Sequence, residues 1–195
     1  RENKWHSISG NSLTFSFLLQ PELDLDKLGL FSLLAAVSVC EGIKKITGIN
    51  CKIKWPNDIL VDGEKIAGVL IENREINEKR FMCVGIGINV NENLEQLHSE
   101  IISKSTSLFI KLEKTVQREQ LLAQILNSFE NYYPKNMNRV RISWLEFCDH
   151  LNQEVKFYFG DELVKGKFNT INQNGYAEVK INGENCVYTG GIIEF

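Results

Sequence analysis

The sequence predicts an α+β fold, in which a central mixed β-sheet packs against helices and a small β-unit follows. Three observations support this prediction. Segments rich in apolar and β-branched residues are joined by glycine-containing turns in the first half of the chain. Longer segments between residues 28 and 150 repeat apolar side chains at helical spacing. After His150, short alternating strands return.

Composition places the chain among globular proteins and excludes several function classes. Hydrophobic residues make up 43% and charged residues 24% of the 195 residues, and the net charge is −3. This balance provides no general attraction to nucleic acid or to anionic membranes. The apolar run at residues 30–40 is too short to cross a bilayer. We therefore expect a cytoplasmic protein that binds no membrane and, within these residues, no nucleic acid.

The cysteines and histidines form no catalytic or metal-binding pattern. Five cysteines are spread singly, without CxxC spacing, which favours free buried thiols over a disulfide framework or a zinc site. The three histidines are far apart in the sequence. We therefore expect neither a histidine-based metal site nor a cysteine or histidine nucleophile.

The larger predicted domain, residues 1–150, begins with a strand and a buried helix. Residues 12–19 mix apolar side chains with Ser and Thr, which predicts a strand. Residues 28–46 are apolar on nearly all sides and stop before Gly48, which predicts a buried helix with acidic residues near its start and Lys44-Lys45 near its end. Four more strands are expected, at residues 51–54, 58–61, 65–73 and 80–89.

Two helices and a second β-unit complete the prediction. Thr115 is the expected N-cap of a helix that Pro134 ends, and a further helix is expected over residues 140–150. Beyond that point, Gly-containing turns such as Asn174-Gly175 separate short strands. We predict that residues 151–195 form a small β-barrel that packs on the larger domain, because a unit of this size is marginal alone.

The segment Lys54–Asp58 (KWPND) places polar side chains between apolar strands. Asp62-Gly63 is a strong signal for a two-residue hairpin turn. With that turn, Leu60 lies opposite Lys65 and Asp58 opposite Ala67, and all four side chains share one face. Asp58 and Lys65 are then within side-chain reach. They either form a surface ion pair or bracket a magnesium ion and a phosphate.

The apolar strand that ends at Asn89 contains Gly85 and Gly87. Glycine weakens a strand unless a ligand must approach the backbone closely. A dinucleotide fingerprint is excluded, because the third glycine is absent and no helix clearly follows. Either these glycines mark a ligand site at which Asn89 bonds a purine edge, or they mark a bulge and Asn89 begins a turn.

The first seven residues are basic around a single aromatic, Trp5. They are either a disordered chain start or a phosphate-contacting loop in which Trp5 stacks on a base.

Together these segments resemble the biotin–protein ligases. The family's KWPND motif stands at Lys54–Asp58, its Lys-apolar-Ala-Gly stretch at Lys65–Gly68, and its GxGxN strand at Gly85–Asn89. The stretch Thr189-Gly190-Gly191 also looks like the family's last domain. The likeness covers nearly the whole chain, with the motifs in the family's order. It implies a class II synthetase-like catalytic fold and an SH3-like C-terminal barrel.

The resemblance implies a two-step reaction that uses ATP, biotin and Mg²⁺. The biotin carboxylate attacks the α-phosphate of ATP to give biotinyl-5′-AMP, and a lysine of a biotin carboxyl carrier domain then displaces AMP. By this likeness Lys65 binds the biotin carboxylate and then the adenylate phosphate, Lys54 neutralises ATP phosphates, and Asp58 holds Mg²⁺ or orients the incoming lysine. The implied biotin site consists of Lys65, Gly68, Val69, Leu70 and Gly85, and the implied nucleotide site of Arg1, Trp5, Lys54, Asn57, Gly87, Ile88 and Asn89.

The N-terminal end departs from the family's pattern. A glycine- and arginine-rich loop precedes the tryptophan in the family, and only its tail stands here, at Arg1–Trp5, with Asn3 in place of the common third arginine. We therefore expect that the chain is truncated at its N-terminal end, and that these 195 residues alone fold imperfectly and make little adenylate.

Three other interpretations stay open. A lipoate-type protein ligase would share the architecture and the carrier-lysine chemistry, although the KWPND stretch favours biotin. A bifunctional biotin-operon repressor would need a DNA-binding domain before residue 1, because the residues given show no basic recognition helix. A catalytically inactive module that binds carboxylases would keep the fold without the reaction. Homodimer formation is compatible with all of these.

Overall fold

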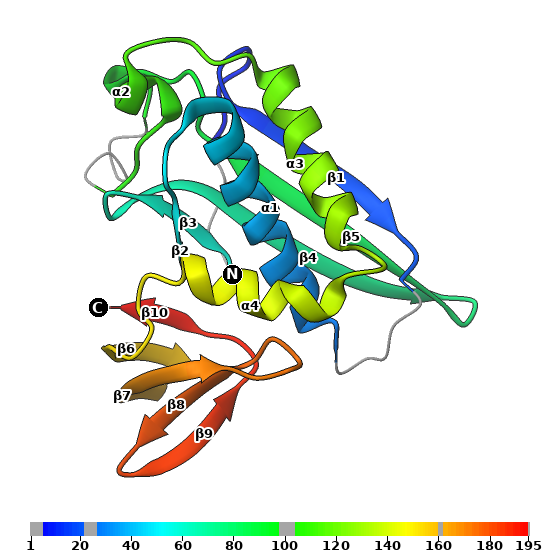
Figure 1. Cartoon of the computed structure of the whole chain (residues 1–195), viewed down its shortest axis with the longest axis vertical. Coiled ribbons are helices and arrows are strands. Elements are labelled where there is room, and N and C mark those ends of the chain that lie inside the picture. The colour runs from blue at the N-terminus through cyan, green and yellow to red at the C-terminus, as the bar shows by residue number, and fades with distance from the viewer. Residues whose placement is uncertain (1–5, 22–26, 98–103, 160–161, 195) are drawn as a thin grey trace.

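Two five-stranded antiparallel sheets and four α-helices make up the described parts of the chain, which confirms the α+β class (Figure 1). The structure is a computed structural model and describes residues 6–21, 27–97, 104–159 and 162–194. In chain order the elements are β1 (Leu13–Leu19), α1 (Gly29–Thr47), β2 (Lys52–Lys54), β3 (Asp58–Val61), β4 (Glu64–Ile76), β5 (Lys79–Ile88), the 3-10 turn η2 (Leu94–Gln96), α2 (Leu108–Leu112), α3 (Arg118–Tyr132), α4 (Met137–Phe147), β6 (Glu154–Phe159), β7 (Glu162–Ile171), β8 (Ala177–Ile181), β9 (Glu184–Tyr188) and β10 (Ile192–Glu194).

The first sheet has the strand order β1-β5-β4-β3-β2. Every pairing between its described strands is antiparallel, so the expectation of a mixed sheet is wrong. The cause is local, because strands β2 to β5 follow one another through short turns, and such turns can join only antiparallel neighbours. Parallel pairing is confined, in the described residues, to two isolated bridges, Ile53–Cys148 and Lys65–Ser105.

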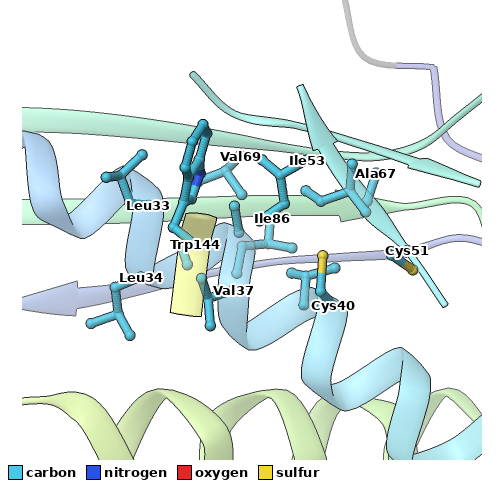
Figure 2. Close-up of a cluster of buried hydrophobic side chains, with 14 of the residues drawn as sticks. Leu33, Leu34, Val37, Cys40, Cys51, Ile53, Ala67, Val69, Ile86 and Trp144 are labelled. Carbon is cyan, nitrogen blue, oxygen red and sulfur yellow. The ribbon is translucent and has the colours of Figure 1, made fainter. Parts of the chain in front are cut away.

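One face of this sheet is covered by helices and forms the core. Figure 1 shows α1 and α3 lying across it. Side chains alternate along each strand, so residues paired across the sheet share a face. The core-facing row runs Leu13, Ile88, Ala67, Ile59, Ile53, and all five are buried. Figure 2 shows Ile53, Ala67, Val69 and Ile86 meeting side chains of α1 and Trp144 of α4.

Helix α1 is the central element of the core. Its residues are buried on nearly all sides, as its apolar sequence predicts. It ends at Gly48, which adopts the left-handed conformation with φ 79°, and Lys44 and Lys45 lie in its last turn, where the helix dipole favours cations. Its first turn contains no acidic residue. The acidic residues expected near its start are Asp24 and Asp26, which lie outside the described residues.

The second sheet, in the order β10-β6-β7-β8-β9, packs against α4 and the start of α1. Arg141 of α4 donates from Nε to the Ile171 carbonyl at 2.6 Å. Gly29 lies so close to this sheet that a Cβ there would be 2.6 Å from the Asn174 carbonyl oxygen. The proposed division at residues 150 and 151, and the closure of this sheet into an SH3-like barrel, stay predictions.

Three helices differ from the sequence-based expectation, one in its existence and two in their boundaries. α2 was not anticipated, α3 begins at Arg118 rather than after Thr115, and α4 covers Met137–Phe147 rather than residues 140–150. No helix in the described parts of the chain is long and apolar enough to span a membrane.

Candidate functional site

The KWPND segment forms the connection between β2 and β3. Lys54 and Asp58 are direct partners across these strands, and the Trp55–Pro56 peptide between them is cis. Trp55 is buried, with 2% of its surface exposed. Asn57 donates from Nδ2 to the Val69 carbonyl, and its own carbonyl accepts from the Val69 N–H at 3.1 Å. The segment therefore anchors the β2–β3 turn to β4.

The β3–β4 hairpin has the expected turn but an altered register. Asp62 and Gly63 both have positive φ, at 52° and 80°, as a two-residue turn requires. Leu60 lies opposite Lys65 as predicted. A bulge then places Asp58 opposite Gly68, so the predicted pairing of Asp58 with Ala67 is wrong.

The bulge decides which way Lys65 points. In a regular strand, Gly68 and Ile66 would share one face, and Ala67 and Lys65 the other. The extra residue lets Ile66 and Ala67 both be fully buried. Lys65 consequently lies on the same face as Asp58 and Gly68, away from Ala67. Bulges are known to redirect side chains in this way next to active sites.

Lys65 and Asp58 form the ion pair that their spacing predicted. Lys65 Nζ lies 2.5 Å from Asp58 Oδ1, and their side chains are 37% and 32% exposed. A pair this exposed contributes little stability. Both charges are therefore accessible to a ligand without unfolding any part of the sheet.

Next to this pair, on the face of the sheet opposite the helices, β4 and β5 carry glycine at three neighbouring positions. Lys54, Asp58, Gly68, Gly87 and Thr14 form one row of directly paired residues across five strands. The next row contains Leu70, Gly85 and Ser16. We call Gly68, Gly85 and Gly87 the glycine patch. A Cβ on Gly85 would meet nothing closer than 3.6 Å, so at this position the glycine is not required by packing and leaves room above the backbone.

Asn89 follows the glycine patch where β5 ends. It is buried, its side chain Nδ2 donates to the Thr106 carbonyl at 2.9 Å, and its carbonyl accepts from the Leu108 N–H at 3.2 Å. Thr106 in turn donates its N–H to the Lys65 carbonyl at 2.9 Å. Asn89 and Lys65, which the family resemblance assigns to the adenine and to the biotin carboxylate, are thus joined through one short segment.

The remaining sequence-predicted residues fall into three groups. Leu70 is 61% exposed on the same face as the glycine patch. Val69 and Ile88 have buried side chains on the helix-covered face, so on the open face they present only backbone to a ligand. Arg1 and Trp5 lie outside the described residues.

A surface hollow of about 350 Å³ continues the open face away from Lys65. It is lined by Leu18, Glu72, Arg74, Ile76, Phe81 and Cys83. Leu18, Cys83 and Glu72 form the row that follows Ser16, Gly85 and Leu70. Along β4 and β5, the open face therefore carries charged side chains near Lys65, then the glycine patch, and then the mostly apolar side chains of the hollow.

His150 connects the second sheet to the Lys54 end of the site. The Asp149 N–H donates to the Ile53 carbonyl at 3.1 Å, directly before Lys54. The His150 ring is fully buried and packs edge-on against Phe168 of β7, with 4.3 Å between ring centroids. Burial, and to a lesser extent the positive charge of Lys54, lowers the pKa of His150 from 6.5 to about 4. The ring is therefore neutral near pH 7.

Sequence reasoning missed three contributors to this region: the segment Lys104–Ser107, Lys111 of α2, and His150. The first two reach Lys65 and its hairpin from more than 35 residues away, and no local pattern marks such contacts. The burial of His150 could have been suspected only from the apolar residues around it.

Comparison with known proteins gives a consistent result. Residues 1–91 match the model of the biotin/lipoate A/B protein ligase family. The bifunctional ligase/repressor BirA of Bacillus subtilis is 32% identical over 194 residues, which cover 96% of this chain and 60% of that protein. Biotin–protein ligase 1 of Arabidopsis thaliana is 29% identical over 144 residues, or 71% of this chain and 38% of that protein. The chain thus spans at most about three fifths of these curated relatives.

Solved structures show the same architecture. The biotin protein ligase of Aquifex aeolicus superposes with a TM-score of 0.81 at 28% identity, covering 94% of this chain and 81% of that chain. The same Aquifex aeolicus enzyme in complex with biotin and ATP superposes with a TM-score of 0.78 at 28% identity, covering 94% of this chain and 78% of that one.

Proposed function

This chain belongs to the biotin/lipoate A/B protein ligase family, and on that premise we propose that it is the catalytic part of an ATP-dependent biotin–protein ligase. The observation that carries the proposal is the ion pair of Lys65 with Asp58 beside the glycine patch. A carboxylate substrate can take the place of the Asp58 carboxylate at the Lys65 ammonium, while its ring lies over backbone that carries no side chains.

In the first step, a biotin carboxylate oxygen attacks the α-phosphate of ATP, and pyrophosphate leaves. Two anions must approach each other, so the main requirement is positive charge close to both. Lys65 holds the carboxylate, and Lys54, paired across the strands with Asp58, neutralises the phosphates. The sheet fixes both lysine backbones in advance, which lowers the entropic cost of bringing the reactants together.

In the second step, the amine of a carrier-domain lysine attacks the acyl carbon of biotinyl-5′-AMP, and AMP leaves. The attacking nitrogen must lose a proton as the amide forms. Asp58 lies beside Lys65 and is a third exposed, so it can orient the incoming ammonium group or accept its proton. The acceptor is a biotin carboxyl carrier protein, or the corresponding domain of a biotin-dependent carboxylase.

Asp58 also suits the Mg²⁺ that accompanies ATP. Mg²⁺ commonly binds one or two carboxylates together with substrate phosphates. No group of three His, Cys, Asp or Glu side chains gathers as a metal site in the residues described, so Asp58 would hold the ion jointly with ATP. Bound there, Mg²⁺ would offset the negative charge of the phosphates.

The test is biotin-dependent exchange of labelled pyrophosphate into ATP, followed by labelling of a carrier domain. Activity with biotin and none with lipoate supports the proposal, whereas the reverse preference identifies a lipoate-type ligase. Lys65→Ala separates an enzyme from an inactive binding module. If carrier labelling in cells survives this substitution, the proposed catalytic role of Lys65 is wrong.

A further inference from the structure

Residues Lys104–Ser107, which we call the strap, lie against Lys65, beyond the point where the pairing of β4 with β5 ends at Ala67 and Ile88. The Lys65 N–H donates to the Lys104 carbonyl at 2.8 Å, and the Thr106 N–H donates to the Lys65 carbonyl at 2.9 Å. Ser105, Thr106 and Ser107 are buried, with 7%, 1% and 0% of their surfaces exposed. The strap thus binds both backbone hydrogen-bonding groups of Lys65.

Asn89 holds the strap on the side of β5. Its Nδ2 donates to the Thr106 carbonyl at 2.9 Å, so Thr106 bonds Asn89 through its carbonyl and Lys65 through its N–H. Ser107 adds a hydrogen bond from Oγ to the Glu92 carbonyl at 2.6 Å. Because Asn89 is 7% exposed, its loss would leave the Thr106 carbonyl unpaired in a buried position.

Lys111 holds the other end of the same segment. It lies in α2, which follows the strap directly, and its Nζ contacts Asp62 Oδ2 at 2.9 Å and Glu64 Oε2 at 2.7 Å. Asp62 is the first residue of the β3–β4 turn, and Glu64 follows the turn directly and is the neighbour of Lys65. The hairpin that carries Lys65 is therefore fastened to the strap and α2 at two separate points.

We infer that Asn89 and Lys111 are positioning residues, which hold Lys65 in its ligand-binding orientation through the strap and α2. The inference rests on the proposed function, because it assigns Lys65 to the biotin carboxylate. A lysine ammonium sits on a flexible four-carbon stem, so its position depends on how firmly its backbone is held. Lys65 lies next to a bulge, where ladder hydrogen bonds are interrupted and other bonds must hold the backbone.

The inference makes Asn89 act on biotin binding in the absence of any nucleotide. If Asn89 only contacted adenine, its loss would raise the KM for ATP and leave biotin affinity unchanged. The experiment measures biotin binding by calorimetry without ATP, in the whole protein, for Asn89→Ala, Lys111→Met, Lys111→Arg and Lys114→Met. Lys114 is an exposed lysine near Lys111 and serves as the matched control.

We expect the Kd for biotin to rise about tenfold in Asn89→Ala, which loses a buried hydrogen bond, and about threefold in Lys111→Met, which loses a partly buried ion pair. Lys111→Arg keeps the contacts with both carboxylates and restores binding, and Lys114→Met binds as the unaltered protein does. Unchanged biotin affinity in Asn89→Ala, with a raised KM for ATP, overturns the inference.

Hydrogen exchange at the Thr106 amide separates this inference from the proposed function. That amide donates to Lys65, so it should exchange at least tenfold faster in Asn89→Ala than in the unaltered protein, whether or not biotin binds. Faster exchange in a protein that does not bind biotin rejects the proposed function and the role of Lys65, but keeps the strap as a support of the hairpin. An unchanged exchange rate at the Thr106 amide rejects the strap as the connection between Asn89 and Lys65.

Discussion

His150 should make the folded protein sensitive to acid. Burial holds its pKa at about 4 in the folded chain, against 6.5 for the free side chain. Below pH 6.5 the unfolded chain therefore takes up a proton that the folded chain does not. The free energy of unfolding is fully retained above pH 6.5 and falls as the pH drops from 6.5 towards 4. Linkage over this window gives a loss of about 2 kcal/mol between pH 8 and pH 5.

The measurement is urea unfolding at pH 8 and pH 5 for the unaltered protein and for His150→Gln. The glutamine variant cannot titrate at this position, and the other ionisable groups contribute equally to both proteins. The unaltered protein should therefore lose about 2 kcal/mol more than the variant on moving to pH 5. If both proteins lose the same amount, His150 is protonated in the folded state and the assignment of its burial is refuted.

The remaining predictions concern the site and the junction between the sheets. Lys65→Met should slow ATP–pyrophosphate exchange by about 100-fold or more, with little change in thermal stability because the ion pair is exposed; normal exchange would remove Lys65 from the reaction. Gly85→Ala should leave the urea midpoint nearly unchanged, since its Cβ meets only ordinary contacts at 3.6 Å, yet weaken biotin binding in calorimetry. Gly29→Ala should cost about 2 kcal/mol in urea unfolding because its Cβ would be 2.6 Å from the Asn174 oxygen, whereas Gly190→Ala, with open space around it, should cost almost nothing.

The parts of the fold that the sequence predicted well are those fixed by local geometry. The Asp62-Gly63 turn requires positive φ at both residues, and only a few residue types tolerate it. α1 was recognisable from its long apolar run and its stop at Gly48. By contrast, α2 has five residues, too few for a helical period to appear. α3 begins without a side-chain cap at Gln117, so the Thr115 signal was misleading.

The ion pair at the centre of the candidate site was predictable from the sequence, whereas the contacts that hold it in place were not. The two-residue turn, which sets Leu60 opposite Lys65, and the alternation along β3 were enough to bring Asp58 and Lys65 together. The bonds of Asn89 to Thr106 and of Lys111 to Glu64 span 17 and 47 residues, and they depend on how the chain returns to the hairpin. Sequence spacing does not predict which distant segment will contact the hairpin, because the path of the intervening chain is determined by the whole fold.

The same register that builds the core also determines the composition of the site. Ile59, Ala67 and Ile88 are buried as one row against the helices, and their neighbours along each strand must then face the opposite side. This places Asp58, Gly68 and Gly87 together on the open face without any contact among themselves being required. In a regular strand Lys65 would share the buried face of Ala67. The bulge at Ile66 instead places Lys65 on the open face. A one-residue slip in β4 would expose Ala67 and bury Gly68, so the hydrophobic core stabilises the arrangement of charge that the proposed chemistry needs.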